Sequence, residues 1–108
     1  MANDQIIQEK ANDILRKLKE IGIEHVYIDP PENIRMSYPC ARVRLNIPRT
    51  RYADNHPHIV VPSWEIIYMS YEPDDEYLLK IMDAFQMISA NRHYASDGLH
   101  HYPFILYK

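Results

Sequence analysis

One amphipathic stripe near the start of the chain requires the rest of the fold to supply a partner for it. Apolar side chains recur there at alternating intervals of four and three residues, the spacing of a single helix face. They are Ile7, Ala11, Ile14, Leu18 and Ile21, with Leu15 beside them. Asn3 or Asp4 is placed to cap the first turn, and Gly22 can follow the last turn with a positive φ. Because such a stripe must be buried, the sequence predicts a helix that lies on a sheet.

Three later segments have the character of strands. His25–Ile28 is a short apolar run that a pair of prolines stops. Residues 41–47 alternate apolar and polar side chains, which predicts a strand with one face on the core. Residues 64–71 are apolar on both faces and predict a central strand. Between these two strands, residues 49–62 predict a hairpin-like loop longer than a tight turn.

A second helix is expected after residue 73. Pro73 and the carboxylates that follow it suit a first turn, because the helix dipole favours negative charge there. The helix is expected to end near Ser89. Its predicted buried stripe consists of Leu78, Leu79, Met82 and Phe85.

Two final strands are expected at 92–94 and 102–107, joined by a turn through Asp97-Gly98. Pro103 has no N–H for a ladder, so the last strand is expected to start there or to lie at an edge. Together these elements predict an α+β fold with the order α-β-β-β-α-β-β. We expect a mostly antiparallel sheet of four to five strands packed against two helices. A length of 108 residues favours one domain, 1–108.

Composition argues against several classes of function. The formal net charge of −3 provides no overall basic field of the kind that neutralises nucleic-acid phosphates. A single cysteine, Cys40, permits no intrachain disulfide. No run approaches the ~20 apolar residues of a membrane span, and no basic and apolar leader opens the sequence. We therefore expect a cytoplasmic protein with no membrane partner.

The histidine-rich end is the most obvious candidate for chemistry. His93, Asp97 and His100 lie close in the sequence and could bind a metal ion, as in a small metal-dependent hydrolase. Adjacent His100 and His101 on a strand point to opposite faces, so at most one of them shares a site with His93. The alternative is that these rings hydrogen-bond the turn and cover the sheet edge. The second interpretation is the one that we adopt, with no metal and no cofactor.

No other pattern predicts catalysis. Cys40 opens an alternating strand without a neighbouring base, which favours a packed thiol. The chain has no nucleophile elbow and no glycine-rich phosphate loop. Arg42 and Arg44 form a basic strand face that is either solvated or faces carboxylates such as Asp74 and Asp75 of a neighbouring subunit. Nine tyrosines in so short a chain favour a protein interface over an active site.

The C-terminal two thirds of the chain resembles a family of small tailed-bacteriophage proteins. The resemblance is carried by Arg51-Tyr52-Ala53-Asp54-Asn55, by the strand at 64–71 with Glu72-Pro73-Asp74-Asp75 after it, and by the run 92–101 with the closing Phe104-Ile105-Leu106-Tyr107. The chain differs from the family pattern at Gly98, where asparagine is usual, and at Pro103. Members are tail terminator or head–tail joining proteins. The resemblance implies an α+β subunit of a hexameric ring.

Such a ring would end the tail tube and join it to the head connector or stopper protein in the virion, after assembly in the host cytoplasm. DNA would touch the lumen only in transit. A head-completion or stopper protein of the neck is the closest alternative, and an adaptor that binds a host protein through an edge strand is another. The expected contact residues are Arg42, Arg44, Arg49, Arg51, Tyr52, Asp54, Asp74, Asp75, Arg92, His93, Tyr94, Asp97, His100 and His101.

Overall fold

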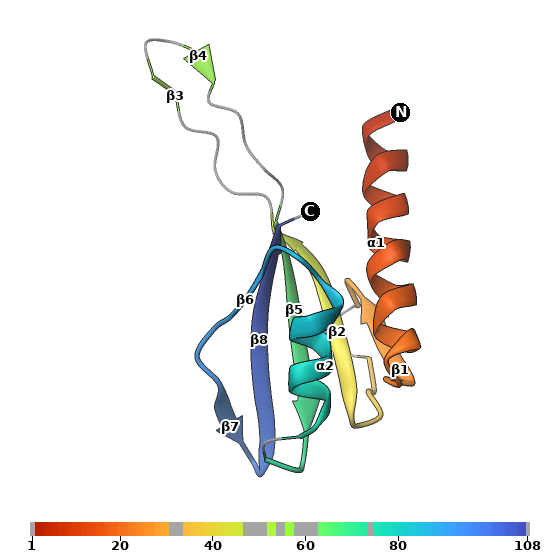
Figure 1. The fold of residues 1–108 in the computed structure, drawn as a ribbon, viewed down its shortest axis with the longest axis vertical. Helices are drawn as coiled ribbons and strands as arrows, with labels where there is room; N and C mark the ends of the chain where they lie inside the picture. Colours follow the sequence, from red (N-terminus) through yellow and green to blue (C-terminus); the bar gives the residue numbers. More distant parts are fainter. Residues whose placement is uncertain are drawn as a thin grey trace.

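The computed structural model describes residues 2–30, 34–46, 52–53, 56–57, 63–73 and 75–107. Two helices lie on one face of a six-stranded sheet (Figure 1). The elements are α1 Ala2–Glu20, β1 His25–Ile28, β2 Cys40–Asn46, β3 Tyr52–Ala53, β4 His56–Pro57, β5 Ser63–Ser70, α2 Tyr77–Ala84, β6 Ile88–Ala90, β7 Tyr94–Ser96 and β8 Leu99–Tyr107. The α+β prediction is confirmed, although the sheet has more strands than the four to five that we expected.

Helix α1 has the face that its periodicity predicts. Ala11, Ile14 and Leu18 are buried in the main core. Gly22 follows the helix with a φ of +112°, a backbone conformation that glycine adopts without strain. The capping prediction is wrong, because the helix begins at Ala2 and contains both Asn3 and Asp4. No described helix combines the length and the apolar character needed to cross a bilayer.

The sheet has the order β1-β2-β5-β8-β6, with β7 also paired to β8. Strand β5 is central, as predicted, and pairs antiparallel with β2 on one side and β8 on the other. The sheet is mostly antiparallel, but β1 pairs parallel with β2. Strands β3 and β4 form a separate antiparallel pair, in agreement with the hairpin predicted for 49–62. Figure 1 shows this pair apart from the larger sheet.

The core lies between the sheet and the two helices. Alternate residues of the inner strands enter it, among them Val43, Ile66 and Phe104. The opposite sheet face has a smaller cluster of Cys40, Ile67 and Met69, against which partly buried Met36 packs. We refer to this face as the open face, because both helices lie on the other side. The alternation predicted for 41–47 therefore corresponds to two unequal faces.

Helix α2 is shorter than predicted. It begins at Tyr77, after the predicted acidic first turn, and ends at Ala84, well before Ser89. Leu79 is 74% exposed, so its place in the predicted buried stripe is wrong. Ile81 is the fully buried residue of the helix, and Phe85 is buried directly after it. Because the helix has only 8 residues, its formation and its bounds depend more on packing against the sheet than on its own apolar periodicity.

The C-terminal strands correct the prediction for Pro103. The predicted turn is present, with Asp97 at a φ of +54° and Gly98 at +78°, the two positive values of a type I′ hairpin. Strand β8 starts at Leu99 and lies inside the sheet, so Pro103 is neither its first residue nor at an edge. The Asn91 N–H donates to the Pro103 carbonyl at 2.8 Å, which directs the backbone polar groups of Pro103 toward the outer strand.

This orientation explains how an inner strand tolerates proline. The missing N–H of Pro103 faces the outer strand, so the β5–β8 ladder loses no hydrogen bond. The outer strand is interrupted at this position. The last β6–β8 pair is Ala90–Phe104, and the first β7–β8 pair is Tyr94–His101. Between these two pairs the outer strand has three residues, 91–93, whereas β8 has only two, 102–103. Residues 91–93 thus form a β-bulge between β6 and β7.

Candidate interaction surfaces

The predicted arginine face lies on the open face of the sheet. Arg42 Nη2 is 3.9 Å from Glu65 Oε1, and Arg44 Nε is 3.6 Å from Asp29 Oδ1. Both distances are long for a direct hydrogen bond, so the two ion pairs are loose. The Nε of Arg42 is buried without a hydrogen-bond partner in the described part of the chain. Each arginine therefore has an intramolecular carboxylate nearby and retains unused donors.

Aromatic rings stack on both sides of the β7–β8 hairpin. Tyr94 and His101 stack with ring centroids 4.6 Å apart and planes 10° apart. His93 stacks on Tyr102 at 5.0 Å and 16°. His100 lies 6.3 Å from His93, whereas adjacent His101 pairs with Tyr94 instead. The prediction that at most one of His100 and His101 lies beside His93 is thus confirmed, and the stacked rings stabilise the hairpin.

The structure does not bring His93, Asp97 and His100 together as three metal ligands. Among the residues described, no group of three or more histidine, cysteine, aspartate or glutamate side chains converges. Asp97 occupies the exposed hairpin turn, while His93 and His100 are approached by Tyr102. The hydrolase alternative therefore has no ligand set in this part of the chain.

Asp75 is turned toward its own subunit. Its Oδ2 accepts hydrogen bonds from Tyr68 Oη at 2.7 Å and from Ser70 Oγ at 3.2 Å. Its Oδ1 accepts one from the Tyr77 N–H at 3.0 Å. Burial, and then the hydrogen bond to the Asp75 carboxylate, raise the pKa of the Tyr68 hydroxyl, so Tyr68 stays a donor. The carboxylate fixes the end of β5 to the start of α2, and its predicted contact with a neighbour remains a prediction.

A tyrosine-rich groove of about 590 Å³ opens beside Asp75. We call it the tyrosine groove, and its walls include Tyr38, Tyr71, Tyr77, Pro39, Glu72 and Glu76. Tyr38 and Tyr71 meet edge to face with ring centroids 5.6 Å apart, and they are 37% and 62% exposed. Exposed tyrosines beside free carboxylates are suited to contact a cationic or aromatic side chain of another protein.

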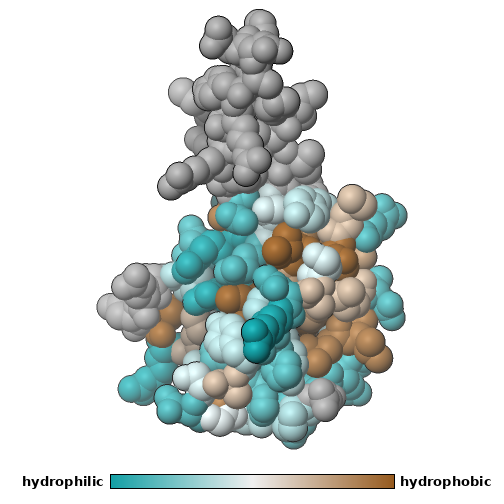
Figure 2. Space-filling view, turned by 90° about the vertical axis from the view of Figure 1, so that its left-hand side faces the viewer, coloured by the Kyte–Doolittle hydropathy of each residue, from teal (hydrophilic) through white to brown (hydrophobic). Residues whose placement is uncertain are grey.

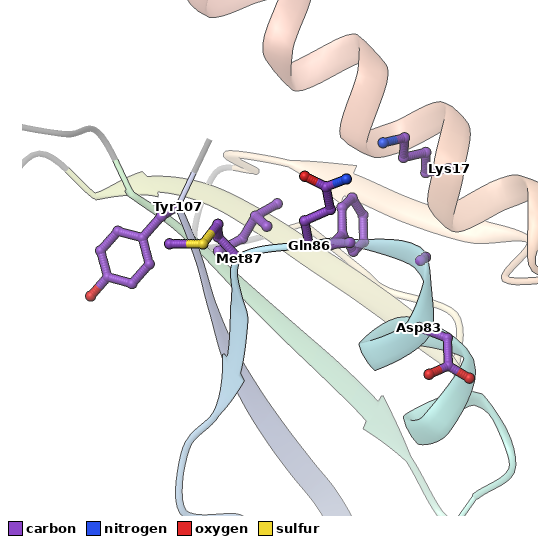
Figure 3. A pocket seen from close by; sticks show the side chains of 8 residues that line it. Lys17, Asp83, Gln86, Met87 and Tyr107 are labelled. Atoms are coloured by element: carbon purple, nitrogen blue, oxygen red, sulfur yellow. The ribbon is translucent and has the colours of Figure 1, made fainter.

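The second groove, of about 550 Å³, lies between the helices and the end of β8. Figure 3 shows Lys17 of α1, Gln86 and Met87 after α2, and Tyr107 of β8 around it. Lys17 Nζ lies 5.5 Å from the Phe85 ring centroid, and Met87 is exposed at the rim. Figure 2, which looks onto the side of the molecule that lies at the left of Figure 1, where β6 and β7 are, shows apolar surface interspersed with polar surface.

Among the described residues, two strand edges have no partner in the sheet order. They are β1 at one end and the β6–β7 strand at the other. Alternation along the ladder shows which backbone groups point outward. The Tyr107 N–H donates to the Met87 carbonyl, and the Asn91 N–H donates to the Pro103 carbonyl. Because the direction of the backbone groups alternates along a strand, the N–H and C=O groups of Ile88 and Ala90 point away from β8. In the two-residue hairpin, Ser96 and Leu99 form the closing pair, so Ala95 also faces outward.

Cys40 is not prepared for nucleophilic catalysis. Its side chain is fully buried, and burial raises the pKa of the thiol to about 11. The nearby Arg42 opposes this shift but does not cancel it. Because the thiolate is the nucleophilic form, the thiol stays protonated and inert near neutral pH. The packed-thiol interpretation agrees with this environment.

Several predicted contact residues fall outside the described residues or their described side chains. Arg49, Arg51, Asp54 and Asp74 are outside the described ranges, and Tyr52 is placed only as backbone in β3. Arg92, Tyr94 and Asp97 are exposed, as a contact surface requires. His93 is exposed as well, while His100 and His101 are partly covered.

The sequence analysis missed the tyrosine groove. Tyr38 and Tyr71 flank two strands whose pairing could have revealed it, because Cys40 of β2 lies opposite Met69 of β5. Continuing this pairing by two residues, to the residue two before Cys40 and the residue two after Met69, brings Tyr38 beside Tyr71. The available signal was therefore the antiparallel pairing of the two clearest strands, each flanked by tyrosine and proline.

Comparisons with models of protein families, with curated proteins and with solved structures found no match for this chain.

Proposed function

We propose that this chain is a structural subunit that assembles into a homo-oligomeric ring, hexameric by the family resemblance. In this proposal the ring ends the tail tube of a tailed bacteriophage and joins it to the head connector. The observation that supports assembly most directly is the pair of sheet edges, at opposite ends of one sheet, that pair with no other described strand. Different surfaces at the two ends permit a head-to-tail contact, which closes into a ring when its rotation allows.

Further features support contact with neighbours. The bulge at 91–93 and strand β7 present exposed Arg92, His93 and Tyr94 at one edge, and the rings of His93 and Tyr94 stack on those of β8. The tyrosine groove adds exposed aromatic surface beside the segments that precede β2 and follow β5. Preorganised aromatic and arginine side chains are characteristic of protein interfaces, since they bury large areas at low entropic cost.

Native mass spectrometry of the purified protein over a range of concentrations tests ring formation. A single closed oligomer, seen as rings by electron microscopy, is the expected result. Strictly monomeric protein at every concentration would overturn the proposal. Immunolabelling of purified particles would then locate the ring, which is expected at the junction of head and tail.

A phage that lacks the protein separates the tail terminator from the stopper alternative. If the ring ends the tail tube, its absence should leave tube length uncontrolled and heads intact; if the chain instead closes the head, its absence should leave heads that lose their DNA. Electron microscopy of the defective particles distinguishes the two outcomes. We expect abnormal tails. Filled heads and normal-length tails from such a phage would contradict both assignments.

A further inference from the structure

The bulge at 91–93 gives Arg92 a specific position on the sheet edge. Pro103 provides no N–H at this point of the ladder, and the outer strand holds one residue more than β8 between the flanking pairs. Arg92 is exposed and makes no salt bridge within the described part of the chain. A β-bulge changes the direction of the side chains that it carries, and Arg92 is therefore a solvent-accessible cation in the bulge at this sheet edge.

The tyrosine groove has the complementary chemistry. Glu72 and Glu76 in its wall are exposed, and no lysine or arginine belongs to the described residues that line it. Asp75 is already occupied by Tyr68, Ser70 and the Tyr77 N–H, and among the described residues that line the groove Glu72 and Glu76 are the carboxylates without an ion pair. Lys80 Nζ lies 5.0 Å from the Tyr77 ring centroid, so one ring of the groove already interacts with a cation.

Arginine fits such a site better than lysine does. Its planar guanidinium can stack on a tyrosine ring while it donates to carboxylates at the ring edge. Tyr38 and Tyr71 supply exposed rings, and Glu72 and Glu76 supply acceptors. A groove of about 590 Å³ is large enough for one such side chain together with the backbone that carries it.

We propose that the Arg92 bulge of one subunit docks in the tyrosine groove of a second copy of this chain. The inference rests on the proposed ring and identifies one of its contacts. The donor residue lies at the β6–β7 edge, and the acceptor groove lies beside the loops that precede β2 and follow β5. Because donor and acceptor are different surfaces of one chain, the contact is heterologous, as a cyclic ring requires.

Two charge-reversed variants test this contact by native mass spectrometry. Arg92→Glu keeps the acidic groove and places a negative charge at residue 92. The double variant Glu72→Lys/Glu76→Lys keeps Arg92 and makes the groove positive. Each alone is expected to assemble at least about tenfold more weakly than the original chain, because like charges meet. Mixed in equal amounts, they pair opposite charges at every contact of an alternating ring. Assembly should therefore return, with equal numbers of the two variants.

Arg35→Glu is the matched control, because it changes the charge equally at another exposed arginine. It should assemble normally, and circular dichroism should show all variants folded. Should the original chain form rings while the mixture stays monomeric, or should either variant alone form rings normally, the Arg92 contact is wrong and the ring proposal stands. If the original chain itself never assembles, both proposals fall together.

Discussion

At the scale of single residues, one carboxylate organises the end of the central strand. Asp75 accepts from Tyr68 and Ser70 of β5 and from the first backbone N–H of α2. Three donors satisfy this half-buried carboxylate, and the loss of one of them leaves a carboxylate oxygen without a hydrogen bond, which lowers the stability of the folded state. The helix start, and with it one wall of the tyrosine groove, depends on this arrangement.

Removing a single hydroxyl tests that dependence. Tyr68→Phe keeps the ring in the core but removes a donor to Asp75, so we expect a loss of about 1–2 kcal/mol in the free energy of unfolding. For a domain of this size, that loss lowers the melting temperature by roughly 4–12 °C. Thermal unfolding followed by circular dichroism measures it. Tyr71→Phe is the control, since Tyr71 is largely exposed and should change little. Equal melting temperatures for the two variants would show that the hydrogen bond contributes nothing.

Cys40 provides a test that depends on pH. Its folded pKa is raised to about 11 by burial, while an unfolded thiol titrates near its ordinary value of about 8.5–9. The raised pKa contributes stability below pH ~9, and that contribution is lost as the pH rises toward 11. Urea unfolding at pH 7.5 to about 10.5 should therefore show a steeper decline for the original chain than for Cys40→Ala. Parallel declines would indicate that the thiol is not responsible, since all other titrating groups are common to both proteins.

At the scale of elements, backbone geometry decides where helices and strands end. Gly22 ends the α1 segment at a φ of +112°, and Gly98 completes the β7–β8 turn at +78°. Their surroundings differ. A Cβ on Gly22 would lie 3.0 Å from Cε1 of Tyr77, whereas a Cβ on Gly98 would meet nothing within 4 Å. The two positions therefore share a conformational demand and differ in available space.

The two glycines allow strain and crowding to be separated. Gly98→Ala should cost about 1 kcal/mol, because only the left-handed backbone penalises the new Cβ. Gly22→Ala should cost clearly more, on the order of 2 kcal/mol or above, since the Tyr77 ring must also move. Chemical denaturation of both variants measures the difference. Double replacement with Tyr77→Ala should reduce the additional cost at Gly22, and a Gly98→Ala cost equal to that of Gly22→Ala would argue against crowding.

At the scale of the whole molecule, the sheet is unfinished at both ends. Strand β1 and the β6–β7 strand each leave backbone groups without a partner in the described sheet. Such edges are aggregation hazards unless they are shielded or used. The ring that we propose uses them, and it would also add interface burial to the stability of a small domain.

Ala95→Pro is designed to block one edge without disturbing the hairpin. The Ala95 N–H faces away from β8, so proline removes an outward donor and leaves the β7–β8 ladder intact. We expect oligomers to dissociate to monomers of nearly unchanged melting temperature, as measured by native mass spectrometry and calorimetry. Ala95→Ser keeps the N–H and should assemble normally. Intact rings with proline at this position would exclude the β7 part of the edge from the contact.

Features governed by local spacing followed from the sequence. The α1 stripe, the alternation in β2 and the Asp97-Gly98 turn each depend on residues within one element, and each was predicted. The period of apolar residues and the tolerance of glycine and aspartate for positive φ are properties of the local chain. The division of His100 and His101 followed from the same alternation.

Features that depend on distant partners did not follow. The start of α2 is set by the contact of Asp75 with β5. Strand β8 tolerates Pro103 because the missing N–H of Pro103 faces the outer strand and not β5. The tyrosine groove exists because the pairing of β2 with β5 places Tyr38 beside Tyr71. Hydrogen bonds and packing between segments far apart in the chain determine these features, because a local pattern carries no information on which partner satisfies it.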